Sequence, residues 1–226
     1  GDNALGIYLG NPNVHNMGSM LTARHLLTGL KSRSRFSATS IDQLPHHIVC
    51  MHMFGHVLRI PVPDINRTQH MLIIGANPLA SNGSIMTAAN VRQKIKDIRK
   101  RDGKVIVIDP RRTETADVAD EHHFIRPGSD ILLLLAMLNE IYAQGFVKES
   151  QASLLTQDFE KIKDLAKDYT TEKVASLTGI ESAEIKRLVK EYCEAPSAVL
   201  YGRMGVSVQE FGLLSQYLIM LINDAL

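Results

Sequence analysis

Short apolar runs alternate with longer helical patterns along most of the chain, and this alternation limits the possible folds more than any other feature. The runs typical of strands cover residues 4–9, 71–75, 104–108, 123–125 and 198–201. The patterns typical of helices cover residues 17–30, 45–58, 85–101, 131–144, most of 151–195, and a last stretch from about 209. Strands that alternate with helices of this length indicate βαβ units. We therefore expect an α/β fold with a doubly wound, mostly parallel, Rossmann-like sheet and helices on both faces.

Several helix boundaries can be predicted from single residues. Ser129, Thr170 and Ser182 are expected N-caps, because their hydroxyl oxygens can accept a hydrogen bond from the first helical turn. Gly103 and Gly145 are expected to end helices, Gly103 in the left-handed conformation that glycine adopts without strain.

Composition excludes several classes of protein. The chain has 226 residues, of which 45% are hydrophobic and 22% charged, as expected for one large or two small globular domains. A net charge of +1 gives no electrostatic reason to expect binding to nucleic acid or anionic membranes. No apolar run approaches the roughly 18 residues that cross a bilayer. Cys50 and Cys193 are too few for a disulfide framework, so a reducing, cytoplasmic location is expected, with the periplasm left open.

The loops that follow the predicted strands share glycine, asparagine, aspartate and arginine. They read Gly10-Asn11-Pro12, Gly75-Ala76-Asn77-Pro78, Asp109-Pro110-Arg111-Arg112, Pro127-Gly128-Ser129-Asp130 and Gly202-Arg203-Met204-Gly205. In open parallel sheets the carboxyl ends of the strands meet at one edge, where ligands bind. The polar residues of these loops are therefore expected to lie together.

The residue types in these loops suit a nucleotide. Glycine lets a ligand approach the backbone, and arginine and helix amides bind phosphate. A carboxylate can accept two hydrogen bonds from a ribose diol or from the paired N–H groups of guanine, which adenine lacks. The same residues are also common in ordinary turns, and Arg111 and Arg112 can equally be solvated. The fingerprint GxGxxG is absent, which disfavours an NAD-binding dehydrogenase domain. The phosphate-binding loop GxxxxGK is absent as well, which disfavours hydrolysis of ATP or GTP.

Five segments resemble the molybdopterin oxidoreductases of the dimethyl sulfoxide reductase and formate dehydrogenase class, in the order found in that family's catalytic subunit. They are YLGNPNVHNMGS, SATSIDQLPHH, IPVPDINRTQHMLIIGANPLASNGS, VIVIDPRRTETADVADEHHFIRPGSD and LYGRMGVS. The resemblance covers almost the whole chain. It implies that the chain is a central fragment of a larger multidomain enzyme. The two ends of the sequence, which look cut, agree with this expectation.

The resemblance implies a bis(molybdopterin guanine dinucleotide) cofactor that carries molybdenum or tungsten. Gly75, Asn77, Pro78 and Ser81 would line the first guanine dinucleotide. Asp109, Pro110 and Arg111 would hold its ribose and phosphate region, Asp130 after Gly128 would recognise guanine, and Met204 and Gly205 would lie near the pterin. Residues 45–226 would form this Rossmann-like cofactor-binding domain.

The resemblance also implies a protein ligand to the metal within residues 34–45. No cysteine lies there, and alignment favours Asp42, with Ser40 as second choice. A carboxylate is a suitable hard ligand for oxidised molybdenum, although Asp42 could instead cap the helix expected from Pro45. Aspartate in this position makes formate oxidation doubtful. Residues 1–44 are then part of a neighbouring α/β domain that contains the metal-ligand loop.

Parts of the family's enzymes have no counterpart in this sequence. The cysteines of the amino-terminal 4Fe-4S cluster and the carboxy-terminal domain are missing, so the expected partners are those domains, a small-molecule substrate and possible electron-transfer subunits. The resemblance implies an enzyme that catalyses two-electron redox of a small substrate. The fragment alone is expected to be inactive. A nucleotide-binding module without metal chemistry stays open as an alternative, as does a zinc site among His46, His47, Cys50, His52 and His56.

Overall fold

The computed structural model describes residues 3–10, 13, 16–86, 88–147 and 159–224. The chain divides into two compact units, Gly1–Leu44 and Pro45–Leu226. Each unit is described by itself.

The first unit is a small parallel βαβ arrangement. Strands β1 (Ile7–Leu9) and β2 (Arg35–Ser37) pair in parallel, and helix α1 (Met17–Gly29) connects them. The Asn16 side chain caps α1 by accepting a hydrogen bond from the Ser19 amide at 2.9 Å. A short helix, α2 (Thr39–Asp42), follows β2. Neither β2 nor α2 is evident in the sequence, because three or four residues are too few to show a period.

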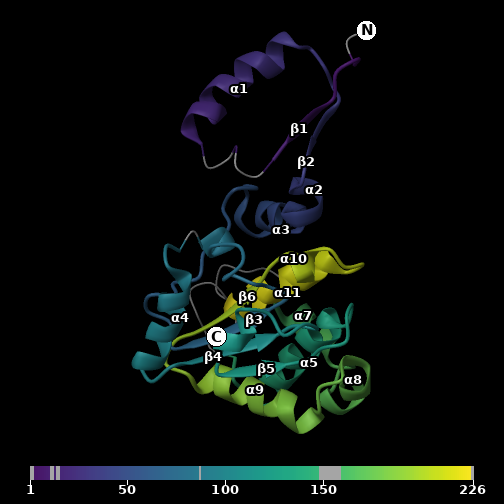
Figure 1. Ribbon diagram of the computed structural model, residues 1–226. Coiled ribbons are helices and arrows are strands. Elements are labelled where there is room, and N and C mark those ends of the chain that lie inside the picture. Colours follow the sequence, from purple (N-terminus) through teal and green to yellow (C-terminus); the bar gives the residue numbers. More distant parts are fainter. Residues whose placement is uncertain (1–2, 11–12, 14–15, 87, 148–158, 225–226) are drawn as a thin grey trace. The chain divides into compact units, whose positions relative to one another are not determined.

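The second unit is built on a four-stranded parallel sheet with the order β5-β4-β3-β6 (Figure 1). Its strands are β3 (His70–Ile74), β4 (Lys104–Ile108), β5 (Glu121–His123) and β6 (Ala198–Gly202). His70, at the start of β3, lies opposite Lys104 on one side and Ala198 on the other. All four strands therefore end at the same edge, as the sequence predicts for them. The strand predicted at 4–9, whose loop was expected at this edge as well, belongs instead to the separate two-stranded sheet of the first unit.

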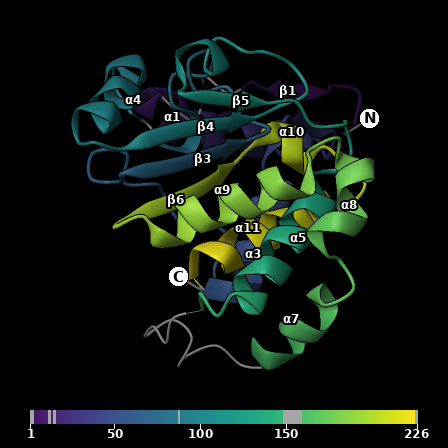
Figure 2. The same cartoon turned by 90° about the horizontal axis from the view of Figure 1, so that it is seen from below.

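Helices cover both faces of this sheet (Figure 2). On one face the side chains of Leu72, Ile74, Ile106 and Ile108 pack against a core supplied by helices on that side. Those helices are α5 (Asp130–Ala143), α7 (Phe159–Ala166), α8 (Thr171–Thr178), α9 (Ser182–Glu194) and α11 (Gly212–Asp224). The opposite face, with Met71, Ile73, Val105 and Val107, packs against α4 (Val91–Lys100). The doubly wound α/β prediction is confirmed.

The outer edge of β6 is closed by a side chain. The Asn223 amide of α11 accepts a hydrogen bond from the Leu200 N–H and donates one to the Leu200 carbonyl, both at 2.9 Å. These bonds replace those that a further strand would make, so the edge does not present its full set of backbone groups. Helix α3 (Leu44–Phe54) packs beside this edge through Val49 and Cys50, which contact Met220. Among the helices of the described residues, none has the length and apolarity needed to cross a membrane.

Several predicted boundaries are wrong. The strand predicted at 4–9 shortens to β1, and the one at 123–125 lies two residues earlier as β5. The helix predicted from 85 begins only at Val91, after a short 3-10 turn (Ser84–Met86) and the left-handed Asn90, whose φ is +52°. The helix predicted from about 209 is present as α11, which begins at Gly212, and the short helix α10 (Met204–Ser207) was not predicted. The part of the 151–195 prediction that covers 151–158 lies outside the described residues.

The predicted caps are correct only in part. Thr170 caps α8 and Gly145 follows α5 with a φ of +69°, as expected. Ser129 occupies the N-cap position of α5, but its hydroxyl donates to the Arg126 carbonyl instead. Glu181, not Ser182, is the N-cap of α9. Asp102 rather than Gly103 takes the left-handed conformation after α4, and glycine is needed at 103 because a Cβ atom would lie 2.3 Å from the Gln69 carbonyl oxygen.

Candidate functional site at the carboxyl edge of the sheet

The loops after β3 and β6 are in direct contact at two glycines. The Gly205 amide donates to the Gly75 carbonyl at 2.9 Å. Gly75 has a φ of +56°, and a Cβ atom on it would lie 2.8 Å from the Val206 nitrogen. A Cβ atom on Gly205 would lie 2.8 Å from the Gly75 oxygen. Packing between the two loops therefore accounts for both glycines, which the sequence prediction assigned to cofactor contact.

Asn77 joins the β3 loop to the β4 loop. Its side-chain oxygen accepts a hydrogen bond from the Thr115 hydroxyl, and its side-chain nitrogen donates to Glu114, both at 2.7 Å. The Thr115 hydroxyl in turn accepts from the Leu79 amide at 3.1 Å. In the same loop Pro78 is buried and Ser81 is exposed. The network fixes the shape of the edge, so Asn77 has a structural role whatever it binds.

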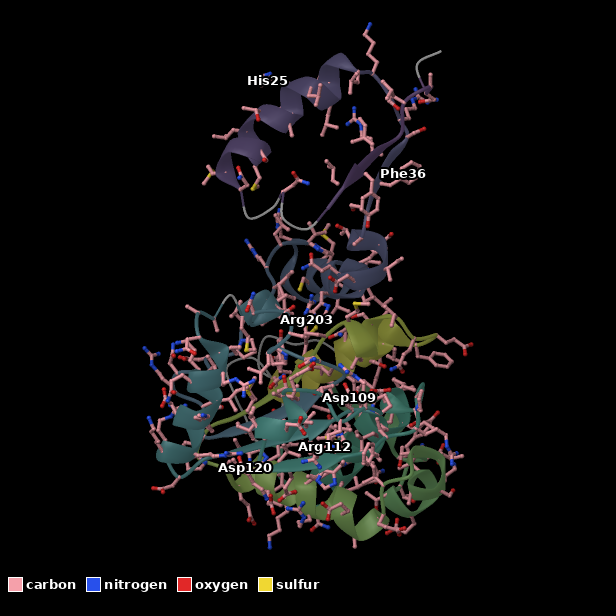
Figure 3. All side chains as sticks on the ribbon, in the orientation of Figure 1. His25, Phe36, Asp109, Arg112, Asp120 and Arg203 are labelled. Atoms are coloured by element: carbon pink, nitrogen blue, oxygen red, sulfur yellow. The ribbon has the colours of Figure 1, made fainter. Side chains whose placement is uncertain are left out.

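Asp109 is half-buried directly after β4 (Figure 3). One of its carboxylate oxygens accepts a hydrogen bond from the Arg111 amide at 2.8 Å, which folds the loop back on itself. Burial raises the pKa of the Asp109 carboxyl above its ordinary value, and the hydrogen bond from Arg111 opposes this shift. Its backbone oxygen is within 3.1 Å of the His122 ring.

The two predicted phosphate-binding arginines extend into solvent from the same loop. The Arg111 side chain is 67% exposed and lies 3.7 Å from Glu114, whereas Arg112 pairs with Asp117 at 2.8 Å. Exposed pairs of this kind are weak. Arg111 can therefore turn toward an anion at small cost, while Pro110 beside it is exposed.

Asp130 is the most deeply buried carboxylate on this edge, at 2% exposure in the first turn of α5. One oxygen, Oδ2, accepts a hydrogen bond from the Gln209 side chain at 2.6 Å. The other, Oδ1, is buried without a hydrogen-bond partner. Burial raises the pKa of the Asp130 carboxyl, and the negative charge of Asp109 raises it further. Gly128, two residues before, has a φ of +84° and is exposed.

The loop after β6 places one buried and one exposed residue at the edge. Arg203 is 6% exposed, and its Nε donates to the Ser84 hydroxyl at 2.7 Å (Figure 3). Met204 beside it is 53% exposed. Burial, together with the charge of Arg203, lowers the pKa of His46 in α3 to about 4, so this imidazole is neutral at physiological pH.

Asp42 and Ser40, the two predicted metal ligands, belong to the first unit. Asp42 ends α2 and lines a cavity of about 520 Å³ within that unit, whose lining also includes Arg24, Arg35 and Thr39. Ser40 is exposed and does not line it. Because Asp42 belongs to α2 itself, it is not the N-cap of the helix that follows.

Among the described residues, the side chains that could together bind a metal ion are not the histidines of the alternative zinc site. They are Glu121, His123 and Glu184, whose ligand atoms lie within 4.8 Å of one another. Arg187 already hydrogen-bonds both Glu121 and Glu184, and Lys104 contacts Glu121. Because these cations occupy the carboxylates, the cluster is an ion-pair network that joins β4, β5 and α9.

Sequence reasoning missed Gln209 and Thr115. Gln209 lies in an irregular loop between two helices, and its side-chain nitrogen also donates to the Gly205 carbonyl at 2.6 Å. Neither residue shows a spacing or a motif that would identify it from sequence. The contacts of Gln209 with Asp130 and Gly205 form only in the folded chain, where the segment after β6 meets the start of α5.

Comparisons with known proteins identify the family. Residues 2–186 match the family described as molybdopterin oxidoreductase. The F420-dependent formate dehydrogenase 2 subunit alpha of Methanococcus maripaludis is 31% identical over 82% of this chain. Formate dehydrogenase H of Escherichia coli is 31% identical over 65% of it. The matched segments span 27% and 20% of those two relatives.

The fold comparison agrees. Acetylene hydratase from Pelobacter acetylenicus superposes with a TM-score of 0.71 over 90% of this chain and 27% of its own, at 22% sequence identity. At this identity the superposition supports the fold alone. From the family match over residues 2–186, we conclude that this chain belongs to the molybdopterin oxidoreductase family.

Proposed function

We propose that this chain forms the part of a molybdenum or tungsten oxidoreductase that holds one guanine dinucleotide arm of a bis(molybdopterin guanine dinucleotide) cofactor. Residues 45–226 supply the nucleotide cradle, and residues 1–44 supply the metal-ligand loop. The observation that carries the proposal is the half-satisfied Asp130 carboxylate at the ligand-binding edge of a parallel sheet.

Asp130 suits guanine because one oxygen of its buried carboxylate has no hydrogen-bond donor. A buried acceptor without a donor costs about 1–3 kcal/mol, so proteins rarely retain one unless something completes it. The N1–H and amino groups of guanine form a donor pair that matches the two oxygens of a carboxylate. Adenine offers no such pair, so the same residue would discriminate between the two bases.

The neighbouring loops suit the rest of the nucleotide. One oxygen of Asp109 accepts from the Arg111 amide, and its other oxygen can accept a hydrogen bond from a ribose hydroxyl. The exposed Arg111 guanidinium can form paired hydrogen bonds with phosphate oxygens. Met204, exposed after β6, and Gly205 would contact the pterin end. When bound, the metal would supply two-electron redox chemistry, while the protein binds and orients the cofactor.

Asp42 is the proposed protein ligand of the metal. It lines the cavity of the first unit, is partly buried, and ends a helix that immediately follows a strand. Substrate would bind near it, and electrons would leave through a 4Fe-4S cluster in another part of the enzyme.

Calorimetric titration of the chain with GDP, ADP and NAD under identical conditions tests the proposed nucleotide preference. We expect GDP to bind more tightly than ADP or NAD, and Asp130→Ala to abolish that preference. Asp97→Ala, which removes a half-exposed carboxylate on α4, is the matched control and should leave GDP binding unchanged. Tighter binding of NAD or ADP by the unmodified chain would instead favour a dehydrogenase-like module.

A further inference from the structure

The site proposed for guanine is covered in this structure. Asp130 is 2% exposed, so a base cannot reach its carboxylate unless a covering group moves. Gln209 is in contact with that carboxylate, since its side-chain nitrogen lies 2.6 Å from Asp130 Oδ2. The same nitrogen lies 2.6 Å from the Gly205 carbonyl oxygen, so its two hydrogens serve two acceptors.

The chemistry of this contact resembles the one that guanine would make. A primary amide and the 2-amino group of guanine both present an N–H donor on a planar nitrogen. Gln209 supplies one such donor to Oδ2 and leaves Oδ1 without a partner. A base that offers two adjacent donors would satisfy both oxygens, which a single amide donor does not do.

Gln209 can leave at modest cost. It is only partly buried, and it lies in the segment between α10 and α11 rather than inside a helix. If it turns away, its amide can hydrogen-bond water, while Asp130 receives donors from the ligand. Displacement of Gln209 is favourable only for a ligand that itself donates a hydrogen bond to Asp130, in place of the Gln209 amide.

We propose that Gln209 is a specificity-determining residue that holds the Asp130 carboxylate as in this structure and is displaced by guanine. This inference rests on the proposed function, because it takes the base read by Asp130 to be guanine. It predicts that Gln209 competes with the ligand. Removing it should therefore strengthen guanine binding, which is the reverse of what removing a ligand-contacting residue would do.

The experiment compares GDP and ADP titrations of the unmodified chain, Gln209→Ala and Gln209→Met, with Gln144→Ala as the control. Gln144 also donates its side-chain amide to a carboxylate of α5, Glu140, at 2.8 Å, but at the opposite end of the helix. Circular dichroism establishes that each variant folds, and the methionine variant preserves side-chain length if the alanine variant does not.

We expect about a tenfold lower Kd for GDP in the Gln209 variants, the size of one charge-assisted hydrogen bond that no longer has to be broken. The Kd for ADP and the Gln144→Ala titrations should not change. If GDP binds the unmodified chain, and binds the Gln209 variants equally or more weakly, the proposed competition between Gln209 and guanine is overturned. The proposed function would then still stand. If GDP binds neither the unmodified chain nor the variants, both proposals fail.

Discussion

Asp109 and Asp130 show how two carboxylates on one sheet edge acquire different properties. Asp109 accepts a hydrogen bond from its own loop, whereas Asp130 depends on Gln209 from a segment far along the chain. Both carboxyl pKa values are raised by burial. Sequence reasoning identified the two aspartates from their positions after strands, but the partner of Asp130 could not be predicted, because nothing local to Gln209 marks it.

Asp42 allows a prediction at the level of one atom. In the enzyme loaded with its cofactor, Asp42→Ala should remove an oxygen neighbour of the metal, because the proposed ligand is a carboxylate. X-ray absorption at the metal edge measures that neighbour. Ser40→Ala is the control, since Ser40 does not line the cavity that Asp42 lines. An unchanged spectrum in Asp42→Ala, or a change confined to Ser40→Ala, would exclude Asp42 as the ligand.

At the level of elements, regular strands were easier to predict than the loops that shape the site. The runs 71–75, 104–108 and 198–201 were found to within a residue, because buried parallel strands are continuously apolar. The helix predicted from 85 starts only at Val91, because Asn90 adopts a left-handed conformation that an apolar period does not reveal. Likewise, the contact between Gly75 and Gly205 depends on two loops that are distant in sequence.

The glycine contact predicts the effect of adding a methyl group. Gly75→Ala and Gly205→Ala should each lower the free energy of unfolding by about 2 kcal/mol or more, because the new Cβ meets backbone that cannot rotate away. Urea unfolding measures the change. Gly145→Ala is the control: it has a φ of +69° but open space around it, so it should cost only about 1 kcal/mol. Equal costs at the three positions would argue against loop packing as the role of Gly75 and Gly205.

The ion-pair network joins strands to a helix and makes stability depend on pH. Burial alone would raise the pKa of Glu121, but hydrogen bonds from Arg187, Lys104 and His123 outweigh it and lower the pKa to about 2. The pKa values of the Glu184 and Glu191 carboxyl groups are lowered as well. Carboxyl groups with lowered pKa values stabilise the fold above their ordinary value of 4.5, and this stabilisation is lost as pH falls toward about 2.

Arg187→Ala tests this network. We expect a loss of about 1–2 kcal/mol in the free energy of unfolding at pH 7. The loss should be smaller at pH 3, because the carboxyl groups of the unfolded chain are then protonated and much of the stabilisation from the lowered pKa values is already gone. Urea titrations at the two pH values give the difference. Lys190→Ala breaks an exposed pair with Glu194 on the same helix and should cost less than about 0.5 kcal/mol at either pH. A pH-independent loss in Arg187→Ala would point to lost packing instead.

At the level of the whole molecule, the family and the α/β architecture were both predictable from the sequence. The ordered motifs identified the family, and the alternation of strands and helices predicted the doubly wound sheet. The chain spans only 16% to 27% of three formate dehydrogenase relatives that it matches.

The measurement that tests the guanine assignment most directly is a base swap at Asp130. Xanthine keeps the N1–H donor of guanine but carries a carbonyl acceptor in place of the 2-amino group, so it matches an amide rather than a carboxylate. We predict by calorimetry that the unmodified chain prefers GDP over xanthosine diphosphate and that Asp130→Asn reverses this preference. Loss of binding to both nucleotides in Asp130→Asn, or an unchanged preference for GDP, would contradict the assignment of Asp130 as the residue that reads the base.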